Sequence, residues 1–219
     1  MKKFMKIFSI FMVFTILLTG CDNSSNLTDA LKFKQEYEKL NSDSKLPKVS
    51  IDDDNVIKYI TFEDVRMILE GGTGVIYFGF PECPWCRNMV PVLLEAADIT
   101  GLDTIYYYNA LDIRDKKSLD ENGNIITEKE GTDEYKYIIS KLNNYLGEYK
   151  GLNDPTVKRL YFPTVLFVYE GEVVDIHIGT LESQTDPYIT LSQEQVDELK
   201  NIYIEGIHKV LNDICDETC

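Results

Sequence analysis

The sequence predicts an α/β fold in which helices flank a central, mixed β-sheet. Val75 to Phe80 is a run of apolar and aromatic residues of the kind found in strands that are covered on both faces. Strand and helix patterns alternate around this run, which predicts parallel strands joined by helical crossovers. Thr164 to Tyr169 and Val173 to Ile178 are strand patterns joined by a Gly-containing turn, which predicts an antiparallel hairpin.

The first twenty residues have the composition of a signal peptide. Three lysines precede an apolar stretch, 7–18, that is too short to span a bilayer comfortably. The stretch ends in Leu-Thr-Gly before Cys21, and this segment resembles a bacterial lipoprotein box, in which the cysteine is lipidated. The resemblance implies a signal peptide over 1–20, a lipid anchor on Cys21 in the cell membrane, and a folded part in the cell envelope, outside the cytoplasm. The alternative is an ordinary signal peptide or short anchor with a chance cysteine.

Residues 21–48 are polar and predict a tether followed by a helical extension. The pattern from Asp29 to Leu40 predicts a charged helix, and Pro47 ends the segment. We expect the whole segment to act as a stalk that holds the domain, residues 49–219, off the membrane.

A strand over 56–60 and a helix over 62–69 precede the central strand, and a strand over 103–108 follows later. Thr61 is suited to cap the helix, which stops at Gly71-Gly72.

Two cysteines open the helix that follows the central strand. Pro81 stops the strand, and Pro84 fits the first turn of a helix, where its missing N–H costs nothing. Cys83 is therefore expected at a helix N-terminus, where free backbone N–H groups and the positive end of the dipole favour its thiolate. Cys86 lies one turn deeper and is close enough to form a disulfide with it. An exposed attacking thiolate and a shielded resolving thiol suit dithiol exchange.

Residues 109–160 exceed what the sheet needs and are expected to form an insertion. Asn122-Gly123 predicts a hairpin or a solvated loop, and Asp133 is suited to cap a helix from Glu134 to Leu146. The insertion either overhangs the dithiol and selects substrates or only enlarges the core. A last helix is expected to follow Ser192 as its cap.

Two blocks of sequence resemble the thioredoxin-like superfamily. Tyr77 to Cys86 is similar to the active-site segment of that family, and Phe162 to Val173 is similar to its cis-proline, strand, turn and strand. Pro91 matches the proline that kinks the active-site helix. The resemblance implies a thioredoxin fold with an N-terminal helical extension and an insertion before the cis-proline strand.

The resemblance also implies a protein thiol–disulfide oxidoreductase that uses Cys83 and Cys86 as its redox disulfide. Cys83 is the expected nucleophile and Cys86 the resolving thiol. Four further residues are expected to contact the protein or peptide substrate: Trp85, Phe162, Pro163 and Thr164. The segment also resembles bacteriocin transport accessory proteins, which implies the maturation of a secreted, disulfide-bearing peptide.

The direction of electron flow stays open, because the active-site segment departs from the family pattern. Tyr77 stands where thioredoxins carry a buried acid, so that the proton of the resolving thiol passes to Glu82, to water or to the tyrosine hydroxyl. Glu82 raises the pKa expected for Cys83, whereas Arg87 and the helix end lower it. The Pro84-Trp85 pair is neither that of thioredoxin nor that of the strong periplasmic oxidants.

The remaining cysteines suggest a second disulfide, and the net charge limits the classes of binding partner. Cys215 and Cys219 are expected to form a second, structural disulfide, or alternatively to relay electrons to the first pair. No metal and no organic cofactor are expected. The formal net charge of −15 argues against nucleic acid or anionic lipid as a partner. The resemblance to a thiol–disulfide oxidoreductase implies a membrane redox partner. The rival hypothesis is a non-catalytic binding or accessory lipoprotein that keeps the fold and uses the disulfide structurally.

Overall fold

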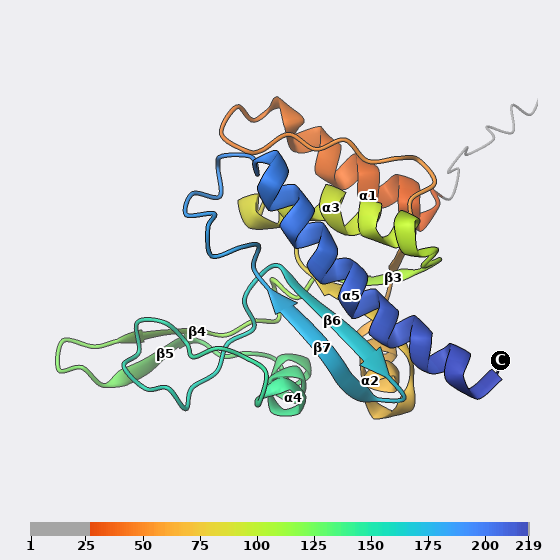
Figure 1. Ribbon diagram of the computed structural model, residues 1–219. Helices are drawn as coiled ribbons and strands as arrows, with labels where there is room; N and C mark the ends of the chain where they lie inside the picture. The colour runs from red at the N-terminus through yellow and green to blue at the C-terminus, as the bar shows by residue number, and fades with distance from the viewer. Residues whose placement is uncertain (1–26, 219) are drawn as a thin grey trace, which may run out of the picture.

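The computed structural model describes residues 27–218, with side chains up to residue 211 (Figure 1). Within this range one mixed sheet has the strand order β1-β3-β2-β6-β7. Its strands are β1 (Ile57–Tyr59), β2 (Gly74–Phe78), β3 (Ile105–Tyr108), β6 (Thr164–Tyr169) and β7 (Glu172–Ile178). The first three strands are parallel to one another, whereas β6 is antiparallel to β2 and β7 to β6. This topology is that of the thioredoxin fold, so the predicted fold class is confirmed.

The central strand β2 is buried along its whole length. Tyr77 lies opposite Tyr107 on one side and opposite Val165 on the other. The C-terminal end of β2 therefore delivers the chain to the start of the next helix, directly beside the start of β6. This is the place where the two cysteines and the cis-proline meet.

Helices cover both faces of the sheet. In Figure 1, α5 (Gln193–Thr218) crosses in front of β6 and β7 and packs against α3 (Pro84–Thr100), whereas α2 (Phe62–Gly71) lies behind the sheet. Thr61 forms a capping box with Asp64 at the start of α2, and the Ser192 hydroxyl accepts the N–H of Gln195 at 3.3 Å before α5. The predicted caps of α2 and α5 are thus present. None of the helices in residues 27–218 is long and apolar enough to cross a membrane.

The N-terminal helix α1 (Asp29–Glu38) is part of the core, which corrects the expectation of a stalk. It is followed by the short 3₁₀ helix η1 (Lys39–Ser42). Phe33 and Tyr37 are fully buried, and the Phe33 ring lies 5.0 Å from that of Tyr107, centroid to centroid. The two residues are four apart, so they project from one face of the helix. That face packs on the sheet beside Tyr77, and the Tyr37 and Tyr77 hydroxyls lie 2.7 Å apart. Asp29 and Glu36 add hydrogen bonds to Tyr59 of β1, accepting its N–H and its hydroxyl.

Arg87 ties this extension to the active-site helix. Arg87 is 1% exposed, and its guanidinium donates to the carbonyl oxygens of Pro47 at 2.6 Å and Tyr37 at 2.8 Å, and to Asn41 Oδ1 at 2.7 Å. A buried guanidinium needs such a set of acceptors. The side chain is thus directed toward the extension, which corrects its expected role in lowering the pKa of Cys83.

The insertion holds a two-stranded sheet and a helix. Strands β4 (Lys116–Leu119) and β5 (Ile125–Lys129) form the predicted hairpin around Asn122-Gly123, and it projects from the molecule in Figure 1. Helix α4 (Asp133–Leu142) ends four residues earlier than predicted, in a turn before Gly147. The cap is also corrected: Thr132 accepts the N–H of Tyr135, and Asp133 is the first helical residue.

Candidate functional site

The two cysteines occupy the first turn of α3. Cys83 is the N-cap, and its sulfur accepts the backbone N–H of Cys86 at 3.2 Å. Pro84 takes the first helical position, where the missing N–H has no intrahelical partner to lose. Both cysteines are free thiols, Cys86 being fully buried and Cys83 4% exposed. Cys83 is therefore more shielded than predicted.

The cis-proline loop is what shields Cys83. The peptide bond between Phe162 and Pro163 is cis, and the Cys83 sulfur lies 3.8 Å from the Phe162 carbonyl oxygen. Phe162 also packs edge-on against Phe80, with 5.5 Å between ring centroids. Thr164 is fully buried and donates to the Tyr161 carbonyl oxygen at 2.7 Å. Phe162 and Pro163 thus border the sulfur, whereas the Thr164 side chain holds the loop.

The pKa values of the two thiols move in opposite directions. The hydrogen bond from the Cys86 thiol is the largest cause that lowers the pKa of Cys83, and the backbone N–H groups of Cys86 and Trp85 and the charge of Arg114 add to it against burial. Burial is the main cause that raises the pKa of Cys86 well above the ordinary value. One sulfur is prepared to attack as a thiolate, while the other is held protonated.

We expect the alkylation of Cys83 by iodoacetamide to titrate with a midpoint below about 8.5, the ordinary thiol value. The thiolate is the reacting species, so the rate falls only as the pH drops through this lowered pKa. Peptide mass spectrometry of the reduced protein assigns the rate to Cys83. A midpoint at or above that of the urea-unfolded chain would contradict the assignment.

Two buried tyrosine hydroxyls stand next to Cys86. The hydroxyl of Tyr77 lies 2.7 Å from that of Tyr37, and a hydrogen bond from Tyr77 lowers the pKa of Cys86 against the effect of burial. Burial holds the pKa of Tyr77 far above its usual value, so this hydroxyl stays protonated and donates. Gly79 leaves room for it, because a Cβ there would lie 2.1 Å from the Tyr77 oxygen. Glu82, the other candidate, is exposed.

Tyr77→Phe is expected to slow the attack of Cys86 on a mixed disulfide about tenfold or more, because a hydrogen bond to a charged group contributes about 1.5–3 kcal/mol. The decay of a preformed mixed disulfide, followed by quenching and mass spectrometry, measures this step. Tyr203→Phe is the matched control, since the buried Tyr203 hydroxyl has no hydrogen-bond partner within residues 27–211. If the mixed disulfide decays at the same rate in the two variants, Tyr77 does not assist the attack of Cys86.

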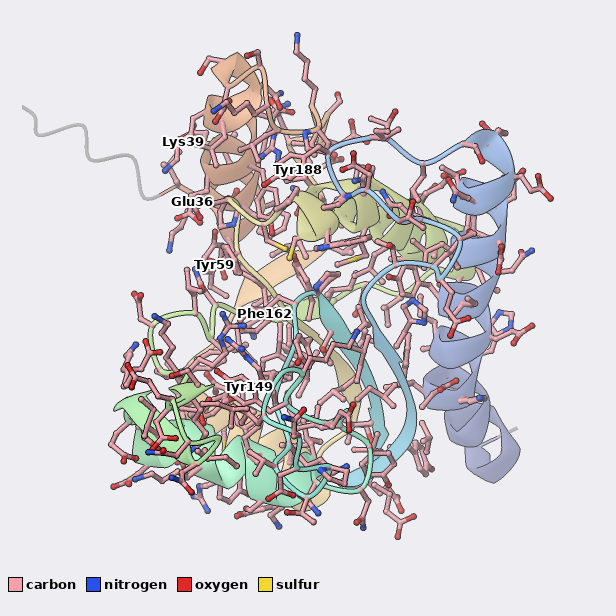
Figure 2. All side chains as sticks on the ribbon, turned by 90° about the vertical axis from the view of Figure 1, so that its left-hand side faces the viewer. Glu36, Lys39, Tyr59, Tyr149, Phe162 and Tyr188 are labelled. Carbon is pink, nitrogen blue, oxygen red and sulfur yellow. The ribbon has the colours of Figure 1, made fainter. Side chains whose placement is uncertain are left out.

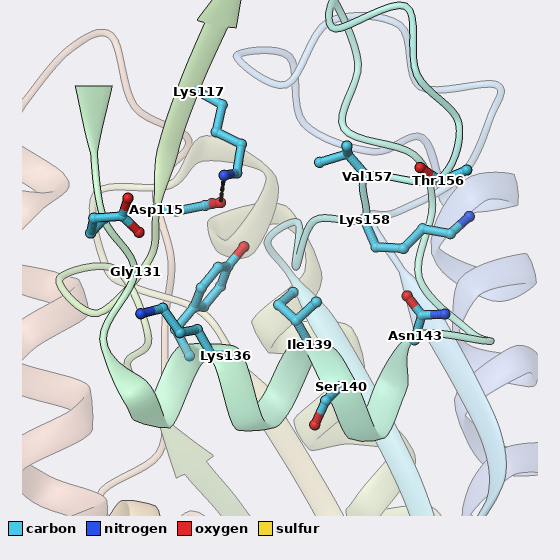
Figure 3. Close-up of a pocket in the computed structure, with 12 residues that line it drawn as sticks. Asp115, Lys117, Gly131, Lys136, Ile139, Ser140, Asn143, Thr156, Val157 and Lys158 are labelled. Atoms are coloured by element: carbon cyan, nitrogen blue, oxygen red, sulfur yellow. Dashed lines mark ion pairs between the residues drawn. The ribbon is translucent and has the colours of Figure 1, made fainter. Parts of the chain in front are cut away.

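A hollow of about 1260 Å³ opens beside the dithiol. Trp85 and Phe162, two of the predicted substrate contacts, line it together with the turn that follows β7. Trp85 is half-buried. A smaller hollow of about 280 Å³ lies between α4 and the hairpin, where Asp115, Lys117 and Lys158 line it (Figure 3). None of the predicted site residues lies in the smaller hollow, so the larger one is the candidate substrate groove.

Sequence reasoning missed a cation that the insertion brings to the site. The guanidinium carbon of Arg114 lies 4.8 Å from the centre of the Phe162 ring, and its charge helps to lower the pKa of Cys83. Arg114 follows β3 in an irregular segment. The signal in the sequence was only a basic residue in an acidic chain. The predicted lipidation site Cys21 and the Cys215–Cys219 pair lie outside the residues whose side chains are described.

Comparisons with known proteins find thioredoxins among solved structures. Thioredoxin O2 from Arabidopsis thaliana, in the oxidized state, is similar at a TM-score of 0.36 with 17% identity, over 69% of this chain and 94% of that chain. Thioredoxin from Aeropyrum pernix has a TM-score of 0.32 with 21% identity, over 67% and 86%. The sequence matches no protein-family model and no curated protein. The fold assignment therefore rests on the strand order and directions of this chain's own sheet.

Proposed function

We propose that this chain is a thiol–disulfide oxidoreductase that exchanges disulfides with protein or peptide substrates through Cys83 and Cys86. The observation that supports this most is the pairing of two free thiols in one helical turn, with pKa values shifted in opposite directions. An inert structural bridge does not need this asymmetry, whereas dithiol exchange depends on it.

In the reducing direction, the Cys83 thiolate attacks one sulfur of the substrate disulfide. A mixed disulfide forms, and the first substrate sulfur leaves as a thiolate. The Cys86 thiol passes its proton, directly or through water, to the substrate thiolate that has just left, while Tyr77 donates a hydrogen bond to the Cys86 sulfur. The Cys86 thiolate then attacks the Cys83 sulfur. The second substrate thiolate leaves. The substrate has gained two electrons and the protein holds a Cys83–Cys86 disulfide; in the oxidising direction the same steps run in reverse.

The proposed location is the cell envelope, with the domain anchored to the membrane by a lipid on Cys21. The charged start, the apolar stretch and the small residues before Cys21 support it. A membrane redox partner then restores the dithiol or the disulfide after each exchange. Maturation of a secreted, disulfide-bearing peptide, as in bacteriocin transport accessory proteins, is the narrower proposal.

Catalysed reduction of insulin disulfides by dithiothreitol tests the proposal. A fragment of residues 27–219 is expected to speed the precipitation of the insulin B chain, whereas a non-catalytic binding protein leaves the rate at that of dithiothreitol alone. Protein carrying alkylated Cys83 provides the blank, because the attacking sulfur is then blocked. A rate equal to the blank would overturn the enzyme proposal in favour of the binding one.

A further inference from the structure

The chain has four arginines, and two of them, Arg114 and Arg159, have side chains with no hydrogen-bond or ion-pair partner among the described residues. Arg66 is held by Glu63 and Glu70, and Arg87 is surrounded by oxygen acceptors. The side chains of Arg114 and Arg159 instead form no hydrogen bond or ion pair with any of the described residues, and Arg159 Nε is buried without a partner. Such groups are costly to leave unpaired, and the chain carries 37 acidic residues that offer partners.

The guanidiniums of Arg114 and Arg159 lie over the rings of two consecutive residues of the cis-proline loop, Phe162 and Tyr161. Arg114 stacks on Phe162, as described above, and Arg159 lies 5.6 Å from the centre of the Tyr161 ring and 4.2 Å from that of Tyr149. Figure 2 shows Phe162 and Tyr149 on the same face of the molecule. Since the Phe162 carbonyl lies 3.8 Å from the Cys83 sulfur, Arg114 lies near the dithiol, and its charge acts on Cys83. Arg159 lies beside it, over the preceding residue of the loop, and its charge acts on Arg114.

Charge around this arginine pair, Arg114 and Arg159, favours an added anion. Burial is the main cause that lowers the pKa of Arg114, and the like charge of Arg159 lowers it further. Asp115 is the acid beside them, but one of its carboxylate oxygens lies 3.7 Å from the Lys117 ammonium and the other is buried without a hydrogen-bond partner. A guanidinium presents parallel N–H groups that match the two oxygens of a carboxylate.

We propose that the arginine pair is a carboxylate-binding site that selects substrates with an acidic residue next to the disulfide. This inference rests on the proposed disulfide exchange and names its substrate class. With the substrate cystine at Cys83, the carboxylate lies over the insertion side of Phe162 and bridges the two guanidiniums. The insertion is then a specificity element of the site, which is one of the two roles that its sequence left open.

Two synthetic peptides that differ only in Glu or Gln beside one cystine test this site. The second-order rate constant for exchange with the reduced protein is expected to be about tenfold or more higher for the Glu peptide, as for one charged hydrogen-bonded pair. Arg114→Gln and Arg159→Gln are expected to bring this ratio close to one. Arg66→Gln, which removes an exposed and already paired guanidinium, keeps the ratio.

The ratio of the Glu-peptide rate constant to the Gln-peptide rate constant separates a preference for the acidic substrate from a change in the reactivity of Cys83. Arg114→Gln also raises the pKa of Cys83, but that change slows exchange with both peptides alike. Arg114→Lys keeps the charge without the fork of donors and is expected to retain only part of the preference. If a variant fails to fold, the wild-type ratio still tests the proposal, because a ratio close to one would contradict it.

A binding arm separates failure of this inference from failure of the proposed function. Fluorescence anisotropy of the two labelled peptides, reduced and alkylated, measures their affinity for the protein without any exchange. Tighter binding of the Glu peptide that weakens with salt supports the site even if exchange is absent. Equal rates and equal affinities for the Glu and Gln peptides would overturn it, whether or not the dithiol exchanges.

Discussion

Cys86→Ser is expected to accumulate as a mixed disulfide between Cys83 and the substrate. The buried Cys86 thiol is the only one that the structure places in the same helical turn as Cys83, among residues with described side chains. Without it the second substrate sulfur has no competitor inside the protein, and turnover stops after the first attack. Non-reducing mass spectrometry after mixing with oxidised insulin is expected to show a one-to-one adduct at Cys83.

Cys83→Ser is the matched variant, since it removes the attacking sulfur and leaves the other one buried. It is expected to form no adduct at position 86, because burial raises the pKa of that thiol and shields it. Peptide mapping excludes adducts at the C-terminal cysteines. An adduct at Cys86 in this variant would reverse the assigned roles of the two cysteines. The absence of an adduct from both variants would contradict the assignment of Cys83 as the nucleophile.

Phe33→Ala is expected to lower the free energy of unfolding by about 3–5 kcal/mol, the range for large-to-small changes at fully buried aromatic residues. Phe33 has no exposed surface, and its ring contacts those of Tyr37 and Tyr107 at centroid distances of 4.5 and 5.0 Å. The rings of Tyr59, Tyr77 and Tyr107 around it belong to strands of the sheet and cannot collapse fully into the space left behind. Urea unfolding of the fragment 27–219 measures the loss.

Gln35→Ala controls for helix propensity, because Gln35 is exposed on the opposite face of the same helix. Its effect is expected to stay within about 0.5 kcal/mol. A stalk outside the domain would give equally small effects for both substitutions, so that outcome would contradict the packing of α1 on the sheet. The same reasoning predicts that a fragment that starts at residue 49 is unstable.

The elements next to the dithiol could be predicted because local chemistry determines them. Pro84 and Cys83 mark the start of α3, Thr61 marks the start of α2, and the apolar run in β2 indicates a strand buried on both faces. Each of these signals acts within a few residues of the chain, so tertiary contacts do not change its meaning.

The interactions that cross between distant segments could not be predicted in the same way. Phe33 and Tyr37 looked like the sparse apolar face of a charged helix, and only the sheet beneath them shows that they belong to the core. Arg87 sits beside Cys86 in the sequence, yet three of its four acceptors come from residues 37–47.

The arginine pair shows the same limit at the site itself. Arg114 and Arg159 are 45 positions apart in an insertion with no recurring pattern, and they meet the cis-proline loop only because the insertion folds back on it. A helix was expected to run to Leu146, but α4 ends at Leu142 and a turn begins there. The pattern of a single sequence does not indicate which loops contact each other in the folded protein.

The equilibrium reduction potential of the Cys83–Cys86 pair tests the central claim most directly. The fragment 27–219 is titrated against mixtures of reduced and oxidised glutathione, and the fraction of disulfide at these two positions is measured by alkylation and mass spectrometry. A redox-active dithiol is expected to give a two-electron transition between about −270 and −120 mV, the range from thioredoxin to DsbA. A pair that stays oxidised below about −300 mV, or that never exchanges, would contradict the claim and identify the disulfide as structural.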